Sequence, residues 1–226
     1  MDALKDFQKK INYSFKSEGL LRQALTHSSY ANEHGMKKHS DNERLEFLGD
    51  AVLEITVSRF LYDRYPDYPE GELTRLRASI VCEQTLAFCT RALKLGDYLF
   101  LGKGEDLTGG RERKSVLSDA FEAVIGAIYL DGGMENAAGF IESFVLDDME
   151  NTQLFFDSKT ILQENVQGSG AGKIEYVVTK ESGPDHNKLY EVDVLIGGHT
   201  AGSGTGSTKK AAQQEAAYQA LLKLKK

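Results

Sequence analysis

The sequence predicts an all-α N-terminal domain followed by a small α+β domain with the element order α-β-β-β-α. Over roughly the first 150 residues, apolar side chains recur every three or four positions, which is the period of a helix. After Asn151, β-branched and aromatic residues alternate with polar ones, which is the period of a strand. We place the boundary between Asn151 and Asp157, giving domains 1–151 and 157–226.

The helical period is clearest in four segments of the first domain: Leu20–Leu25, Leu45–Leu61, Leu73–Leu93 and Val116–Leu130. Pro66–Gly71 contains two of the three prolines and predicts a break between helices. The glycine-rich stretch Leu101–Arg113 predicts a flexible connection. A final helix is expected over Glu135–Glu150, directly after a turn at Gly132 and Gly133.

The second domain carries the pattern of a three-stranded sheet between two helices. In chain order we expect a helix at Lys159–Gln167, strands at Lys173–Lys180 and Leu189–Ile196 joined by a turn at Ser182–Asn187, a short strand near Gly198–Gly202, a glycine-rich loop at Gly202–Gly206 and a helix at Ser207–Leu224. Such a module places both helices on one face of the sheet.

Acidic residues recur on one side of the helix predicted to begin near Asn42. Four of them are spaced three or four residues apart: Glu43, Glu46, Asp50 and Glu54. At about 100° per residue they fall within roughly one quarter of the circumference. The remaining residues of this helix are almost all apolar, which predicts burial on every side. Glu54 fits a solvated surface residue, and Glu43 equally fits an acid that stabilises the helix dipole.

The second acidic helix is Val116–Leu130, whose acids Asp119 and Glu122 share one face. Gly126 lies on that face and leaves room for a neighbouring helix or for bound groups. Buried carboxylates require a cation or a compensating network, so we expect the two acidic stripes to face each other around a metal ion. The expected ligands, which suit Mg²⁺ or its substitute Mn²⁺, are Glu46, Asp50, Asp119 and Glu122.

A divalent ion held by carboxylates favours phosphoryl transfer. The sequence has no GxSxG motif, no P-loop and no zinc-spaced Cys/His cluster, and His27 and His34 are predicted to be structural or surface residues. Cys82 and Cys89 are predicted to be reduced packing residues, as in cytosolic proteins. The N-terminus lacks the apolar core of a secretory signal, and no apolar run reaches the roughly 18 residues of a membrane span, so we expect a cytoplasmic protein.

The net charge of −7 is unevenly distributed along the chain. Residues 1–150 carry −8 and residues 151–226 carry +1, with five of the nine C-terminal basic residues after Thr208. Thr208, Lys209 and Lys210 follow the glycine run at the start of a helix, which predicts a phosphate site. The alternative is a solvated turn.

Further contacts with an A-form duplex would come from the loop residue His186 and from one helix. The helix residues are Thr160, Gln163, Glu164 and Gln167. For each of these residues, the alternative is an ordinary polar surface position.

Three segments of the first domain together resemble the motifs of bacterial ribonuclease III. They are LTHSSYANE at Leu25–Glu33, NERLEFLGD at Asn42–Asp50 and SDAFEAVIGAIYLDGG at Ser118–Gly133. The segments DSKTILQENVQ, GPDH and GTGSTKKAAQQEAA after Asp157 resemble the double-stranded-RNA-binding domain that follows the nuclease domain in that family. Thr208 stands where a serine is common in the family, and its hydroxyl should serve equally.

The resemblance implies a Mg²⁺-dependent endonuclease domain that forms a homodimer and cleaves both strands of duplex RNA, leaving 5′-phosphate and 3′-hydroxyl ends with a short 3′ overhang. It implies catalytic and metal-binding roles for the four acids named above and supporting roles for Glu43 and Glu70. The family counterpart of Phe47 inserts into the partner subunit; the alternative for Phe47 is this chain's own core. Processing of ribosomal RNA precursors, messenger RNA and other structured transcripts is a further expectation from the family.

Two other functions fit parts of the sequence. In a non-cleaving regulator that binds duplex RNA, the first domain would be a dimer scaffold, but a scaffold has no need for the buried acids Asp119 and Glu122. In a metal phosphatase acting on small phosphate esters, the second domain would have no purpose.

Overall fold

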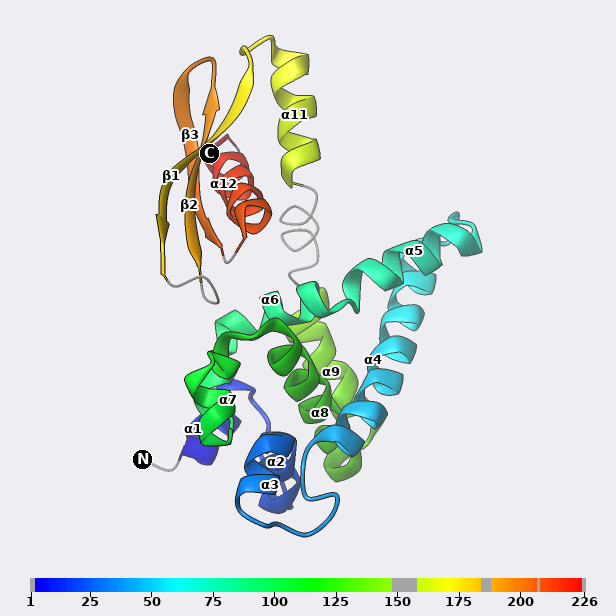
Figure 1. Ribbon diagram of the computed structural model, residues 1–226. Coiled ribbons are helices and arrows are strands. Elements are labelled where there is room, and N and C mark those ends of the chain that lie inside the picture. Colours follow the sequence, from blue (N-terminus) through cyan, green and yellow to red (C-terminus); the bar gives the residue numbers. More distant parts are fainter. Residues whose placement is uncertain (1–2, 148–157, 184–187, 207, 225–226) are drawn as a thin grey trace. The chain divides into compact units, whose positions relative to one another are not determined.

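The computed structural model describes residues 3–147, 158–183, 188–206 and 208–224. The chain forms two compact units, Met1–Asp148 and Met149–Lys226, coloured along the sequence in Figure 1. The boundary expected between Asn151 and Asp157 lies outside the described residues. Among the residues described, every helix is too short or too polar to span a lipid bilayer.

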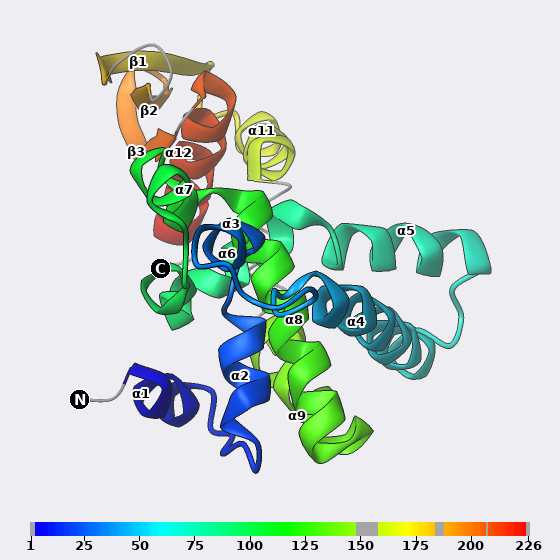
Figure 2. The ribbon, with the colours of Figure 1, turned by 60° about the horizontal axis from the view of Figure 1, so that its bottom comes forward.

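The first unit is helical, as predicted. Its elements are α1 (Ala3–Lys10), α2 (Glu18–Ala24), α3 (Ser28–Glu33), α4 (Glu43–Arg64), α5 (Glu70–Ile80), α6 (Glu83–Leu93), the 3₁₀ turn η1 (Leu95–Tyr98), α7 (Lys103–Leu107), the 3₁₀ turn η2 (Gly110–Glu112), α8 (Lys114–Gly132), α9 (Met134–Ile141) and the π-helical turn η3 (Glu142–Leu146). Helix α8 lies at the centre, and α4, α6, α2 and α9 pack against it (Figure 2).

The burial predicted for the two acidic helices is confirmed for α8 and wrong for α4. Phe121 and Ile125 of α8 are fully buried, as is Leu53 of α4. However, Phe47 and Ile55 of α4 remain 81% and 58% exposed. Helix α4 therefore has two apolar faces, and α8 and its neighbours cover only one of them.

The segment predicted as one helix, Leu73–Leu93, forms two helices, α5 and α6. The backbone of Cys82 is extended at the break, and the Thr85 hydroxyl donates a 2.7 Å hydrogen bond to the carbonyl of Ser79. A side chain thus satisfies a carbonyl that continued helix would have paired, which stabilises the break.

The connection predicted to be flexible, Leu101–Arg113, contains α7 and η2. Arg111 fixes it by donating to the carbonyls of Gly96 and Leu99 and by pairing with Asp106. The helix predicted from Glu135 begins at Met134 and continues as η3, and its predicted end at Glu150 lies outside the described residues.

The second unit has the predicted α-β-β-β-α order. Its elements are α11 (Ser158–Ser169), β1 (Ile174–Ser182), β2 (Leu189–Ile196), β3 (His199–Gly206) and α12 (Lys209–Leu224). The sheet is antiparallel with strand order β1-β2-β3 (Figure 1). Leu162 and Val166 of α11, Val192 and Val194 of β2, and alanines of α12 form one core between the helices and the sheet.

The expected glycine-rich loop at Gly202–Gly206 is instead the second half of β3. Gly202, Gly204 and Gly206 alternate along the strand and face α12, so that a Cβ on Gly204 would lie only 2.3 Å from the backbone nitrogen of Ala216. The glycines therefore allow a close helix–sheet contact. Sequence alone suggested a loop because both a loop and a close helix–sheet contact require small residues.

Candidate metal centre

Helices α4 and α8 cross in backbone contact at two glycines. A Cβ on Gly49 would lie 1.8 Å from the carbonyl oxygen of Glu122, and a Cβ on Gly126 would lie 2.2 Å from that of Leu45. Of the two possibilities for Gly126, the structure therefore shows the neighbouring helix. Glu46 and Glu122 each precede a crossing glycine by about one turn, so the crossing brings their side chains together.

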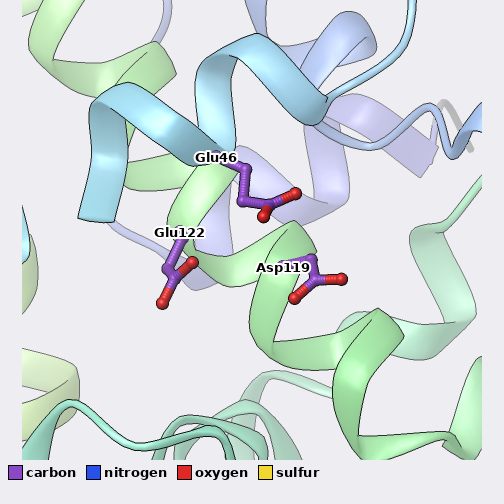
Figure 3. Close-up of side chains that lie close together, drawn as sticks. All are labelled: Glu46, Asp119 and Glu122. Atoms are coloured by element: carbon purple, nitrogen blue, oxygen red, sulfur yellow. The ribbon is translucent and has the colours of Figure 1, made fainter. Parts of the chain in front are cut away.

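Three of the four predicted acids form a cluster. Glu46 projects from α4 toward Asp119 and Glu122 of α8 (Figure 3). Each of these half-buried residues offers a carboxylate oxygen, and these oxygens all lie within 4.8 Å of one another. Because one ion can contact several oxygens at this separation, the arrangement fits a hard divalent cation.

Asp50 is not a member of this group, so the expected group of four is a group of three. It lies one turn beyond Glu46 and is exposed. Its charge nevertheless acts on Glu122, as described below. The predicted supporting acid Glu43 is also exposed, at the first residue of α4. The other, Glu70, is exposed at the start of α5 and accepts a 2.8 Å hydrogen bond from the Thr74 hydroxyl.

Burial and mutual repulsion favour protonation of the clustered acids. Burial, together with smaller contributions from the charges of Asp50, Glu46 and Asp119, raises the pKa of Glu122 to about 8. Burial likewise raises the pKa of Glu46, with smaller contributions from Asp119, Glu43 and Asp50. A divalent cation would replace these protons and offset the repulsion, so the charge of the cluster also fits Mg²⁺.

Two charged residues that act on Asp119, Glu83 and His27, were not predicted as part of the site. Burial raises the pKa of Asp119, the Ser118 hydroxyl lowers it, and the charges of Glu83 and His27 raise and lower it, respectively. His27 caps α3, since its Nδ1 accepts a 3.2 Å hydrogen bond from the Ser29 amide. The structural role predicted for His27 is thus confirmed. No spacing in the sequence relates either residue to Asp119.

The second unit exposes the residues predicted to contact RNA on α11. They are Thr160, Gln163, Glu164 and Gln167. The intervening Leu162 and Val166 are buried, so the four polar residues lie on the outer side of the helix. His186 lies outside the described residues.

At the predicted phosphate site, the structure has no glycine loop at Gly202–Gly206, but a helix does begin directly after Thr208. Thr208 accepts a 3.1 Å hydrogen bond from the Ala211 amide and so caps α12. Lys209 and Lys210 are exposed in the first turn, and the Lys209 ammonium lies 5.6 Å from the centre of the Tyr190 ring. Cationic side chains and helix amides still coincide there, as an anion site requires.

The uncovered face of α4 is apolar and adjoins a groove. Phe47, Ile55 and Tyr62 are 81%, 58% and 72% exposed and recur every seven or eight residues. The alternative that Phe47 belongs to this chain's own core is therefore wrong. A groove between α4 and α9 is lined by apolar residues, including Ile55 and Met134, and by charged residues, including Arg59.

Comparison with known proteins agrees with both units. A Ribonuclease-III-like family model matches residues 17–149, and a double-stranded RNA binding motif model matches residues 158–224. Ribonuclease 3 of Bacillus licheniformis is 49% identical over 227 residues, covering 100% of this chain and 91% of the relative. Ribonuclease 3 of Bacillus cereus (strain AH187) is 51% identical over 226 residues, covering 99% and 92%.

Two solved structures resemble the first unit. One crystal structure of the nuclease domain of ribonuclease III from Campylobacter jejuni has a TM-score of 0.60 and 40% identity, covering 66% of this chain and 97% of that chain. Another structure of the same domain has a TM-score of 0.59 and 41% identity, covering 63% and 95%. Its description concerns flexibility in a region involved in dimer formation.

Proposed function

Because this chain belongs to the ribonuclease III family of double-stranded-RNA-specific endoribonucleases, we propose that Glu46, Asp119 and Glu122 hold Mg²⁺ for hydrolysis of duplex RNA. The observation that carries the proposal is the convergence of three half-buried carboxylates from two crossing helices. Asp50 is a fourth ligand in this proposal, because it lies one turn after Glu46 on α4, next to the group of three, and its charge acts on Glu122. Mn²⁺ offers similar ligand preferences and should substitute.

When bound, Mg²⁺ lowers the pKa of a coordinated water and neutralises charge on the phosphate. The protein supplies the geometry: the Gly49–Gly126 crossing fixes Glu46 opposite Glu122 before any ligand arrives. Glu122, whose pKa is raised, would release its proton on holding the cation. Attack of a water oxygen on phosphorus would release one proton from the water, and the departing 3′ oxygen would take up a proton, leaving 5′-phosphate and 3′-hydroxyl ends.

We also propose a homodimer formed through the exposed face of α4. Phe47 and Ile55 lie four residues before and after Ala51 on the same helix. A twofold axis near Ala51 would therefore place the partner subunit's Phe47 beside Ile55, which lines the groove. Two such sites related by the axis would cut both strands and leave a short 3′ overhang.

The second unit would hold the duplex through the outer side of α11, through His186 and through Thr208, Lys209 and Lys210. These groups suit 2′-hydroxyls and phosphates, so binding would depend on duplex shape and not on base sequence. Precursors of ribosomal RNA and other structured transcripts, including messengers, are the substrates we propose, and the cytoplasm is the location.

The test is Glu122→Gln in the full chain, assayed on an end-labelled hairpin RNA across a Mg²⁺ titration. We expect cleavage to fall by roughly 10³-fold, the scale of losing a group that acts on the transition state, while duplex binding persists. Glu18→Gln, an exposed acid at the start of α2, is the matched control and should cleave normally.

End-group analysis of the wild-type products tests the chemistry separately. Terminal 5′-phosphate and 3′-hydroxyl groups support hydrolysis by activated water, and cyclic phosphate ends would contradict it. Duplex binding by the wild type without cleavage at any Mg²⁺ concentration would favour the non-cleaving regulator instead. Turnover of a chromogenic phosphate ester in preference to duplex RNA would favour the phosphatase.

A further inference from the structure

The connection between α3 and α4 carries an exposed group of basic side chains that the proposed function does not use. Its sequence from His34 is HGMKKHS, and every residue from His34 to His39 is exposed. Lys37 and Lys38 are adjacent in its sequence, between His34 and His39. This positive charge lies in a segment, residues 1–150, whose net charge is −8.

The connection has a defined shape. The Ser40 amide donates to the carbonyl of Lys37 over 3.1 Å, which closes a turn with Lys38 and His39 at its centre. His39 adopts a positive φ of 62°, a left-handed conformation compatible with the third position of such a turn. The turn therefore defines the backbone positions from which the two lysine side chains project.

Both ends of the connection are tied to the helices beneath it. The Met36 amide donates to the carbonyl of Ala31 over 2.9 Å. The Gln23 side chain of α2 donates to the carbonyls of His39 and Asp41 over 3.3 and 3.1 Å. Because these bonds already order the backbone, a ligand binding here would lose less conformational entropy than on a free loop.

The two lysines lack the acidic partners that some basic residues of this unit have. Lys103 pairs with Glu33 and Arg111 with Asp106, whereas within the described ranges no ion pair involves Lys37 or Lys38. Adjacent ammonium groups without acidic partners leave a local positive potential, which attracts a polyanion.

The position of the turn along the chain relates it to the metal centre. It ends at Ser40, and the amide of Asn42 is fixed by a 2.9 Å hydrogen bond to the carbonyl of Thr26 directly before α4 begins. Glu46, a member of the acidic cluster, lies in the first turn of α4. In Figure 2 the connection runs from α3 to the start of α4. The positively charged turn thus comes directly before the start of α4, where the clustered carboxylates would repel RNA.

We propose that the Lys37–Ser40 turn is a second contact with the RNA backbone, in which Lys37 and Lys38 bind phosphates of the duplex near the cleaved bond. This inference deepens the proposed function and rests on duplex RNA being the substrate. The contact is independent of base sequence, because ammonium groups address phosphate charge. It holds the duplex against the nuclease unit in addition to the grip of the second unit.

The test compares Lys37→Gln/Lys38→Gln with Lys5→Gln/Lys9→Gln, which removes the same charge from exposed positions of α1. Cleavage of a hairpin duplex by the full chain is measured at saturating Mg²⁺ over a range of monovalent salt. The turn variant should raise KM by about tenfold and leave kcat within about twofold, since phosphate contacts contribute to binding. Loss of two contacts should also reduce the slope of log KM against log salt by about 1.4–1.8.

The α1 variant should retain the wild-type KM and slope. Equal KM and slope in the two variants would overturn the proposal, and so would a turn variant that lost kcat alone. The proposed function is tested independently: normal cleavage by Glu122→Gln would defeat it, whereas failure of the turn proposal leaves Mg²⁺-dependent cleavage intact.

Duplexes with single neutral methylphosphonate linkages locate the contact. At phosphates bound by the turn, the neutral linkage should weaken cleavage by the wild type and have little further effect on Lys37→Gln/Lys38→Gln. We expect such positions within roughly one helical turn of the cleaved bond. A complete scan in which every linkage affects wild type and variant equally would contradict a direct contact.

Discussion

Gly49 and Gly126 face each other where α4 crosses α8, so closely that neither position has space for a methyl group. A Cβ on Gly49 would lie 2.9 Å from the backbone nitrogen of Gly126, and a Cβ on Gly126 would lie 3.1 Å from that of Gly49. Glu46 and Glu122 precede these glycines by one turn each. The separation of the carboxylates therefore depends on the absence of two side chains.

Gly49→Ala should push the helices apart. We expect the free energy of unfolding to fall by about 1–3 kcal/mol, as for overpacked cores, and Mg²⁺ affinity to fall with it because the carboxylates separate. Urea unfolding and calorimetric Mg²⁺ titration measure the two effects. Gly139→Ala in α9 is the control, since its Cβ would meet nothing within 4 Å. It should stabilise the protein by about 0.4–1 kcal/mol and leave Mg²⁺ binding unchanged.

The metal-free protein should lose stability as pH rises. The pKa of Glu122 is about 8 when folded and near its ordinary 4.5 when unfolded, so folding favours the protonated form. Below pH 4.5 this group does not change the free energy of unfolding. Between pH 4.5 and pH 8 the free energy of unfolding falls as the pH rises. Urea midpoints of wild type and Glu122→Gln should therefore agree near pH 4.5, and the variant should be more stable at pH 8.5. Convergence at both pH values would show that burial does not disfavour ionisation of this carboxylate.

Removal of the Phe47 side chain should weaken the dimer. A buried aromatic anchor contributes about 2 kcal/mol or more, so Phe47→Ala should raise the dimer dissociation constant by roughly 30-fold or more. Light scattering after size-exclusion chromatography over a dilution series measures this. Leu107→Ala, at an apolar residue that is 88% exposed on α7, should not change the dimer. An equal effect of the two substitutions would argue against the α4 interface.

The contact between β3 and α12 should tolerate an added side chain as poorly as the crossing of α4 and α8 does. In Gly204→Ala, the added Cβ would approach the Ala216 nitrogen to 2.3 Å. We expect the second unit to lose about 1–3 kcal/mol of stability or more and duplex-RNA affinity to decline as it unfolds. The neighbouring Ser203 is exposed, so Ser203→Ala should be silent in urea unfolding and in RNA binding. A harmless Gly204→Ala would mean that helix and strand tolerate a wider spacing.

Local patterns predicted much of this structure, because helix and strand periods are properties of short segments. The two acidic stripes and the strands β1 and β2 could be recognised in this way. The break at Cys82 could not, since the Thr85 hydroxyl that stabilises it acts only after the chain has turned. The exposed second face of α4 was also missed, because composition does not distinguish an apolar face that packs internally from one left for a partner.

The sequence by itself determined which residues carry the chemistry: acids spaced three or four apart on two apolar helices, and a basic helix start in a separate α+β unit. Only the tertiary structure decided that Glu46, Asp119 and Glu122 come within 4.8 Å while Asp50 stays outside their group. The physical reason is that residue spacing fixes the face of a helix on which a side chain lies. The relative position of two helices depends instead on which surfaces approach most closely, and here two glycines permit that approach.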